Sequence, residues 1–145
     1  MNVLELSLVI PCHNEEKNLR PLLSAIHETL DPLGLDYEVV ITDDCSTDNS
    51  WSVLKELAVN DPRLRIQRFK INCGESAASW AGMQTARGRN IATLDADLQN
   101  DPKDLPAMLE ALKNADCVCG TRAATRGKGD NWIRIASSHI ASSRL

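Results

Sequence analysis

The sequence predicts an α/β fold with a mostly parallel sheet, and two observations lead to this prediction. Short runs rich in aliphatic and β-branched residues alternate along the chain with segments whose apolar residues recur at helical spacing. Polar clusters follow three of these runs, which is where ligands bind in open parallel sheets. The agreement between the order of the elements and the positions of the polar clusters is stronger evidence than any one cluster alone.

The first third of the chain reads as strand, helix and strand. Residues 6–10 form a mostly apolar run closed by Pro11, as expected for a strand that is buried on both faces. A helix is predicted over residues 14–30, and the Asp-Pro-Leu-Gly sequence at 31–34 ends it. A second strand is predicted over residues 37–41. The apolar positions of the helix share one face: Leu19, Leu22, Leu23, Ile26 and Leu30.

The middle of the chain repeats this alternation. Ser46-Thr47-Asp48 supplies capping side chains for a helix, and Asp61-Pro62 ends that helix. The apolar residues that this helix covers are Val53, Leu54, Leu57 and Ala58. Residues 64–69 alternate apolar and polar or charged side chains, which indicates a third strand. A helix of mostly small residues is predicted over residues 76–86.

The last third begins with a fourth strand over residues 91–94. Asp101-Pro102 is a good start for a helix that continues to residue 113, and a fifth strand is predicted over residues 117–120. A basic, glycine-containing loop is expected over residues 125–130, followed by a weakly helical pattern over residues 132–145.

Composition excludes several classes of function. The chain has 145 residues, enough for one packed core, and a formal net charge of -4, so no global basic field attracts nucleic acid. Only 3% of the residues are aromatic, which disfavours stacking platforms for single-stranded nucleic acid. No apolar run reaches the roughly 18 residues of a membrane span, and no signal peptide is recognised, so we expect a chain that starts in the cytoplasm. The cysteines are scattered without a Cys-x-x-Cys pair and are interpreted as reduced thiols: Cys12, Cys45, Cys73, Cys117 and Cys119.

The segment Asp95-Ala96-Asp97-Leu98-Gln99 follows the predicted fourth strand. Two carboxylates on either side of a small residue suit Mg²⁺ or Mn²⁺, which prefer oxygen ligands and keep substrate phosphates in their coordination shell. Gln99 offers a further neutral oxygen, and a bound cation would offset the charge of a diphosphate leaving group. Taken alone, the Asp-x-Asp triplet also fits a solvated acidic turn.

Two other polar clusters follow the first and second strands. Asp43 and Asp44 can accept hydrogen bonds from a base or a ribose, although a helix cap and turn is the alternative interpretation. Glu15 lies near the expected crevice, but an acidic residue at the start of a helix also complements the helix dipole. For His13, a surface position and a ligand contact are equally expected. Gly74 is interpreted first as a turn, which also permits close approach of a ligand.

Basic residues follow the predicted fifth strand. Arg122 can meet a phosphate with its forked guanidinium. Arg126 and Lys128 can clamp a diphosphate or a lipid phosphate, with a solvated surface loop as the alternative. The chain contains neither a Gly-x-Gly-x-x-Gly nor a Walker loop, so the usual dinucleotide and ATP fingerprints are absent.

Together these motifs resemble those of the family 2 glycosyltransferases, and the resemblance covers nearly the whole chain in the family's order. The Asp-Ala-Asp-Leu-Gln run is most similar to the dolichyl- and undecaprenyl-phosphate sugar transferases. The matching segments are Val9-Ile10-Pro11-Cys12-His13-Asn14-Glu15-Glu16, residues 38–48, Gly74 with residues 77–82, Asp95-Ala96-Asp97-Leu98-Gln99 with Asp101-Pro102, and Gly120-Thr121-Arg122.

This resemblance implies a glycosyltransferase A, Rossmann-like fold with helices on both faces of the sheet. It implies inverting transfer of a sugar from a nucleoside-diphosphate sugar to a polyprenyl phosphate, with Mg²⁺ or Mn²⁺ held by Asp97 and Gln99. Asp97 and Arg122 are the expected catalytic residues, with Arg122 on the donor or acceptor phosphates. The expected donor-binding residues are Pro11, His13, Glu15, Asp43, Asp44, Gly74, Asp95 and Ala96.

Three departures from the family pattern lie in these motifs. Cys45 stands where the family commonly has Gly, Glu75 where a basic residue often follows the glycine, and His13 at an often aromatic position. Family catalytic domains usually continue beyond the end of this chain. We therefore expect a donor-binding domain over residues 1–122 and an incomplete acceptor-side region over residues 123–145, in a fragment that binds donor better than it catalyses transfer.

Two other functions stay open on the sequence alone: transfer to a polysaccharide or a soluble acceptor, and a non-catalytic nucleotide-sugar binding module. A receiver-like domain is disfavoured, because no strand-end lysine for a phosphate switch is evident. The expected partners are a UDP- or GDP-linked sugar and a polyprenyl phosphate lipid, without nucleic acid, and a homo-oligomer stays open. The full-length protein is expected at the cytoplasmic face of the membrane.

Overall fold

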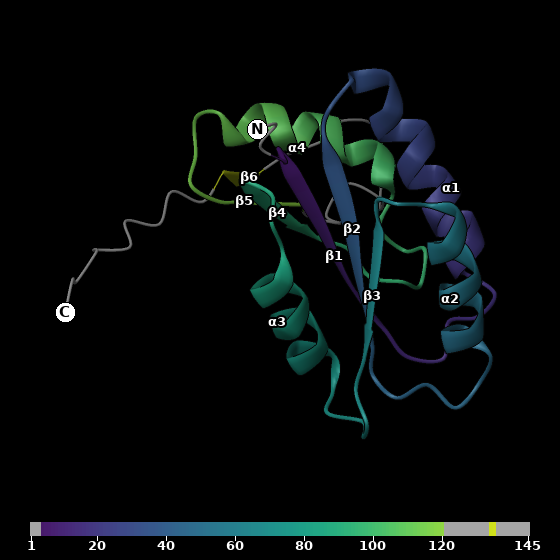
Figure 1. Cartoon of the computed structure of the whole chain (residues 1–145). Helices are drawn as coiled ribbons and strands as arrows, with labels where there is room; N and C mark the ends of the chain where they lie inside the picture. Colours follow the sequence, from purple (N-terminus) through teal and green to yellow (C-terminus); the bar gives the residue numbers. More distant parts are fainter. Residues whose placement is uncertain (1–3, 121–133, 136–145) are drawn as a thin grey trace, which may run out of the picture. The chain divides into compact units, whose positions relative to one another are not determined.

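The computed structural model describes residues 4–120 and 134–135, and the chain folds as two units, residues 1–102 and 103–145 (Figure 1). This division falls before the domain boundary that the sequence suggested at residue 122. The first unit contains the main sheet. Its elements are β1 (Leu6–Cys12), α1 (Leu19–Leu30), η1 (Asp31–Leu33), β2 (Tyr37–Asp43), α2 (Ser50–Asn60), β3 (Leu64–Arg68), α3 (Glu75–Thr85) and β4 (Asn90–Thr93).

The sheet of the first unit has four parallel strands in the order β3-β2-β1-β4. The chain steps from β1 through β2 to β3 in one direction and then returns to β4 on the other side of β1. Because βαβ crossovers are right-handed, helices on the outward steps and the return step must cover opposite faces. Figure 1 shows this arrangement, with α1 and α2 on one side of the sheet and α3 on the other. The predicted parallel α/β fold is confirmed.

The core lies around the two central strands, β1 and β2. Every residue of both strands is buried, as expected for parallel strands covered on both faces. The helix α1 packs its apolar stripe inward, and the residues predicted for that face are all buried: Leu19, Leu22, Leu23, Ile26 and Leu30. The amphipathic pattern therefore identified the buried face of this helix correctly.

The start of α1 differs from the prediction. The helix begins at Leu19 rather than at residue 14, because Asn14 has a left-handed backbone with φ of 57° that interrupts any helix there. Pro11 does not end the first strand but lies inside β1, next to Thr42 of β2 in the register. The helix after the second strand, α2, begins at Ser50, just after the predicted capping residues at 46–48, and covers the predicted apolar positions.

The helix α3 approaches β1 closely at Gly82. A Cβ atom at this position would meet Cγ1 of Val9 at 2.5 Å, well inside van der Waals contact. Only glycine lets the helix backbone lie this near the central strand. Gly82 is therefore a point of close contact between α3 and the sheet.

The second unit contains η2 (Pro102–Asp104) at its boundary, α4 (Leu105–Leu112), β5 (Val118–Cys119) and β6 (Arg134–Ile135). The helix expected to start at Asp101 opens with the 3-10 turn η2, and its α-helical part begins only at Leu105. The fifth strand forms, but it pairs antiparallel with β6 in a separate two-stranded sheet. The helical interpretation of residues 132–145 is wrong at Arg134 and Ile135, because these two residues form a strand.

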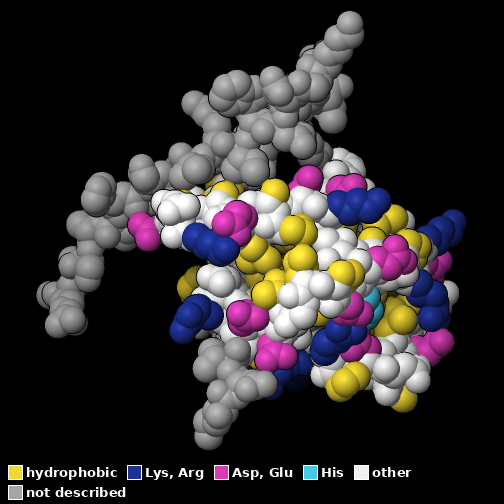
Figure 2. All heavy atoms as spheres, turned by 90° about the horizontal axis from the view of Figure 1, so that it is seen from above, with side chains coloured by type: hydrophobic (Ala, Val, Ile, Leu, Met, Phe, Trp, Pro, Cys, Tyr) yellow, Lys and Arg dark blue, Asp and Glu magenta, His cyan; other side chains and the backbone are white. Residues whose placement is uncertain are grey.

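Figure 2 shows one face on which Lys and Arg side chains are interspersed with Asp and Glu, without a continuous basic area. Among the helices of residues 4–120, none combines the length and the apolar character needed to cross a bilayer. The predicted basic loop at 125–130 lies outside the described residues.

Candidate functional site

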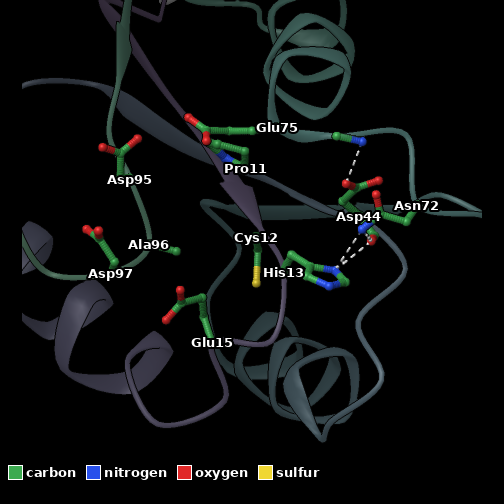
Figure 3. A pocket seen from close by; sticks show the side chains of 11 residues that line it. Pro11, Cys12, His13, Glu15, Asp44, Asn72, Glu75, Asp95, Ala96 and Asp97 are labelled. Carbon is green, nitrogen blue, oxygen red and sulfur yellow. Dashed lines mark hydrogen bonds between the residues drawn. The ribbon is translucent and has the colours of Figure 1, made fainter.

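A cavity of about 370 Å³ opens at the carboxyl ends of β1 and β4, within the first unit (Figure 3). It lies where the strand order reverses, since β2 and β3 extend to one side of β1 and β4 lies on the other. Ligands of open α/β sheets bind at this kind of switch point. The residues that line the cavity are Pro11, Cys12, His13, Glu15, Asp44, Asn72, Gly74, Glu75, Asp95, Ala96 and Asp97.

The cavity brings together most of the candidate residues from the sequence. Pro11 lies near the end of β1, and His13 and Glu15 follow that strand. Asp44 follows β2, Gly74 precedes α3, and Asp95, Ala96 and Asp97 follow β4. Figure 3 shows Asp95 and Asp97 on one side of the view and His13 and Asp44 on the other. Arg122, Arg126 and Lys128 lie outside the described residues.

Asp44 connects the end of β2 to the start of α3. Asp44 is 3% exposed, and its carboxylate accepts the backbone N–H of Cys73 at 2.7 Å and that of Gly74 at 2.8 Å, one on each oxygen. Gly74 has φ of 91°, a backbone conformation that favours glycine. A carboxylate offers about four lone-pair positions, so Asp44 keeps capacity to accept further hydrogen bonds from a ligand.

His13 is held by two hydrogen bonds at the side of the cavity. Its Nδ1 lies 2.9 Å from the carbonyl oxygen of Asp44, and a carbonyl can only accept, so Nδ1 carries the hydrogen. In that tautomer Nε2 accepts from Nδ2 of Asn14, 3.3 Å away. Nδ2 of Asn72 also donates to the Asp44 carbonyl, at 3.4 Å. The imidazole therefore has a defined orientation toward the cavity.

The loop after β1 is tied to the start of α2. Oδ1 of Asn14 accepts the backbone N–H of Thr47 at 2.8 Å, and the N–H of Asn14 donates to Oγ of Ser46 at 2.9 Å. The N–H of Glu15 donates to Oγ of Ser50 at 2.8 Å. These bonds account for the unwound segment before α1 and hold the Glu15 carboxylate at the cavity.

The segment after β4 is a turn that presents two carboxylates. Oδ2 of Asp95 accepts Nδ2 of Asn100 at 2.8 Å, and Oδ1 of Asp97 accepts the backbone N–H of Gln99 at 3.0 Å. Leu98 has a left-handed backbone with φ of 63°, which turns the chain between them. Asp95 and Asp97 line the cavity, whereas Gln99, an expected metal ligand, is exposed and lies outside the lining.

Asp43 does not line the cavity, in contrast to the expectation that it binds donor. Its side chain is fully buried, and its Oδ2 lies 2.9 Å from Nε of Arg68. Arg68 also donates to the carbonyl of Ser46 at 2.9 Å and lies over the ring of Trp51. Adjacent residues in this extended segment point in opposite directions, so only Asp44 reaches the cavity while Asp43 supports the loop behind it.

The lining is strongly acidic. Its carboxylates are Glu15, Asp44, Glu75, Asp95 and Asp97, and no Lys or Arg is among the lining residues that the structure describes. Within residues 4–120, no three or more His, Cys, Asp or Glu side chains form a metal-binding group by themselves. Mg²⁺ usually takes only one or two carboxylates and completes its shell with substrate phosphates and water. The pair Asp95 and Asp97 fits that mode of binding.

Sequence reasoning did not select three of the lining residues for the site: Cys12, Asn72 and Glu75. Burial raises the pKa of the Cys12 thiol to about 12, and the carboxylates of Asp43 and Glu15 add to this effect. The Cys12 thiol is therefore protonated and uncharged at neutral pH, so it lines the cavity without acting as a nucleophile. Its place at the end of β1, and that of Asn72 beyond β3, could have been found from the rule that ligands bind at the carboxyl ends of strands.

Comparison with known proteins gives one consistent family. The model of Glycosyl transferase family 2 matches residues 7–143. An undecaprenyl-phosphate 4-deoxy-4-formamido-L-arabinose transferase of Aeromonas hydrophila is 39% identical over 92% of this chain and 41% of its own length. A dolichol-phosphate mannosyltransferase of Pyrococcus furiosus is 39% identical over 89% of this chain and 36% of its own. The chain thus spans about two fifths of the length of these curated relatives.

Solved structures agree on the fold. A mannosyltransferase of Pyrobaculum calidifontis in complex with GDP-Man and Mn²⁺ is similar with a TM-score of 0.66 and 25% identity, over 74% of this chain and 32% of its own. The S. aureus protein TarS, residues 1–349, has a TM-score of 0.66 and 21% identity, over 87% of this chain and 38% of its own. The predicted glycosyltransferase A fold is confirmed.

Proposed function

The chain belongs to glycosyl transferase family 2, and we propose that it forms the donor-binding part of an inverting, metal-dependent sugar transferase. The proposed donor is a UDP- or GDP-linked sugar, and the proposed acceptor is a polyprenyl phosphate. The names of the relatives from Aeromonas hydrophila and Pyrococcus furiosus support this acceptor class. Because the chain covers only part of those relatives, the complete reaction is proposed for the longer protein and donor binding for the residues described.

One observation carries the donor assignment: an acidic cavity lies at the switch point of the sheet, with Asp95 and Asp97 on its wall. A bare diphosphate would be repelled by this lining, whereas a diphosphate that carries a divalent cation would be attracted. The similarity to a mannosyltransferase structure that contains GDP-Man and Mn²⁺ supports the same pairing of ligand and cation.

Four of the lining residues then have a proposed task. A bound Mg²⁺ or Mn²⁺ would neutralise the diphosphate and stabilise it as the leaving group. Asp97 would hold the cation, and Asp95 would contact the nucleotide or the sugar. Asp44 and His13 lie on the opposite wall in Figure 3. The free acceptor positions of the Asp44 carboxylate would bind the base or the ribose, and the oriented imidazole ring of His13 would contact the nucleotide beside them.

The proposed reaction forms a bond between an acceptor phosphate oxygen and the anomeric carbon of the sugar. The bond from that carbon to the donor diphosphate breaks, and the nucleoside diphosphate leaves with the bonding electron pair. The acceptor phosphate is largely ionised near neutral pH, so its attack requires no strong general base. The chain would act mainly by positioning the donor and by electrostatic stabilisation. Arg122, beyond the described residues, is the proposed contact to the phosphates.

Titration of the chain with GDP and UDP, with and without Mn²⁺, tests the donor site. We expect saturable binding that depends on Mn²⁺ and that weakens roughly tenfold or more in Asp97→Asn, a loss of at least about 1.4 kcal/mol. Asp36→Asn is the control, because Asp36 is exposed and does not line the cavity. Nucleotide binding that does not depend on Mn²⁺ and is unchanged in Asp97→Asn would contradict the proposed role of Asp97 in holding the cation.

A labelled donor tests the acceptor class. After incubation with polyprenyl phosphate, we expect label in the lipid extract rather than in the aqueous glycan fraction. Label in the aqueous fraction alone would favour a polysaccharide or soluble acceptor. Donor binding without transfer or hydrolysis, in the full-length protein as well, would favour a nucleotide-sugar binding module.

A further inference from the structure

Glu75 differs from the other carboxylates of the cavity in its surroundings. Glu15 accepts Nδ2 of Asn18, and Asp44, Asp95 and Asp97 each accept at least one hydrogen bond. Glu75 is exposed and lines the cavity, but its carboxylate has no hydrogen bond or ion pair within the described part of the chain. Neutralising this side chain therefore removes a negative charge from the cavity without breaking an internal contact.

The fold holds Glu75 in a defined place. It is the first residue of α3, and the preceding Gly74 is fixed by its hydrogen bond to Asp44 and by a backbone φ of 91°. Figure 3 shows its carboxylate beside Pro11 and turned toward the side of the cavity where Asp95 lies. The carboxylate thus faces the space in which the proposed donor diphosphate would sit.

We propose that Glu75 makes donor binding conditional on the divalent cation, by repelling a nucleoside diphosphate that arrives without one. This inference rests on the proposed function of the cavity as a donor site. Like charges at a partly exposed site repel strongly at separations of a few ångströms, whereas a bound cation compensates the diphosphate and removes most of that repulsion. Glu75 would therefore affect metal-free binding much more than metal-dependent binding.

The position of Glu75 makes this effect specific. The N-terminus of a helix carries a partial positive charge and otherwise favours anions such as phosphate. At α3 that tendency is opposed, because the first helical residue carries a carboxylate and Asp44 already occupies the N–H of Gly74. At the N-terminus of α3, a diphosphate with a bound cation would therefore be accepted, whereas a bare diphosphate would be repelled by Glu75.

Calorimetric titration of the 145-residue chain with GDP and with UDP tests the proposal, once in EDTA and once in Mn²⁺. The variants are Glu75→Gln and Glu75→Lys. The matched control is Glu28→Gln, which makes the same charge change on α1 at an exposed position that does not line the cavity. In EDTA we expect metal-free affinity to rise roughly tenfold in Glu75→Gln and further in Glu75→Lys. In Mn²⁺ the affinities should change by less than threefold between wild type and Glu75→Gln.

The outcomes separate this inference from the proposed function. If wild type binds with Mn²⁺ but neither Glu75 variant gains metal-free affinity, Glu75 does not control the metal requirement and the inference is overturned. An equal gain in Glu28→Gln would show an effect of overall charge, which also overturns it. If no protein binds either nucleotide in either condition, the donor site itself is refuted and the inference with it. Urea unfolding of each variant verifies that affinities are compared between folded proteins.

Discussion

Oδ2 of Asp44 accepts a 2.8 Å hydrogen bond from the backbone N–H of Gly74, which ties the end of β2 to the start of α3. The other carboxylate oxygen holds the N–H of Cys73 at 2.7 Å. Asp44 therefore lines the cavity and also fixes the backbone before α3 that lines the cavity next to it. Changes at Asp44 should affect stability and binding together.

Asp44→Asn should lower the free energy of unfolding by about 1–3 kcal/mol, because an amide nitrogen cannot accept a hydrogen bond and one partly buried backbone N–H group loses its partner. Urea denaturation measures this change. Asp36→Asn, at an exposed position, should stay within about 0.5 kcal/mol of wild type. Equal stability of the two variants would contradict the structural role of Asp44.

Gly82→Ala should destabilise the chain by about 1–3 kcal/mol, even though alanine is the better helix former. The added Cβ would lie 2.5 Å from Cγ1 of Val9, a stiff side chain in the central strand. Gly120→Ala is the control, since a Cβ there meets no atom within 4 Å. Thermal unfolding compares the two, and a stabilised Gly82→Ala would show that α3 can move away from β1.

Asn14→Ala should destabilise the chain more than Asn14→Gly. Both variants lose the hydrogen bond to the N–H of Thr47, but only alanine is also strained at a backbone φ of 57°. The difference should be about 1 kcal/mol in urea unfolding, with alanine the less stable. Equal stabilities would indicate that the loop relaxes to another conformation when the side chain is removed.

Glu38 forms a buried ion-pair network at the opposite end of β2 from the cavity. Its side chain is 1% exposed. The carboxylate accepts the hydroxyl hydrogen of Ser7 at 2.7 Å and pairs with Nη2 of Arg87 at 2.7 Å and Nη1 of Arg65 at 3.2 Å. Glu38→Gln should lower the free energy of unfolding by about 2–3 kcal/mol. This is less than the loss expected for a fully buried ion pair, because both arginines stay partly hydrated. Glu56→Gln, which breaks an exposed pair with Arg20, should cost less than about 1 kcal/mol.

The same network predicts a pH dependence. Burial alone would raise the pKa of Glu38, but hydrogen bonds from Ser7 and Arg87 outweigh it and hold the pKa below its ordinary value. A carboxyl whose pKa is lowered on folding contributes stability above its unfolded pKa, about 4.3, and loses it as the pH falls through the folded value. The stability difference between wild type and Glu38→Gln should therefore be complete at neutral pH and shrink in acid. A difference that grows below about pH 4 would contradict this sign.

Several features were predictable because they depend on local pattern. The apolar stripe of α1 and the mostly apolar run of β1 identified their buried faces. Strand-end polarity identified Glu15, Asp44, Asp95 and Asp97 as neighbours. Parallel strands bring such residues to one edge of the sheet whatever the detailed loop geometry. For this reason the candidate site was accessible from sequence order alone.

Other features depended on contacts between distant segments. Asn14 looked like a helix start, yet its bonds to Ser46 and Thr47 stabilise a left-handed backbone and delay α1 to Leu19. Local propensity contains no information about these partners. The fifth strand likewise formed where expected, but pairing with Arg134–Ile135 gave it an antiparallel neighbour that spacing could not reveal.

The sequence by itself determined the parallel α/β fold, the family and the acidic segment Asp95-Ala96-Asp97, because periodicity and motif order are properties of the chain. Only the tertiary structure separated Asp43 from Asp44: one is turned to Arg68, the other to the cavity. It also placed Glu75 on the cavity wall. The direction of a carboxylate side chain depends on which neighbours balance its charge or donate hydrogen bonds to it. Those neighbours come from distant parts of the chain and lie beside it only when the sheet has formed.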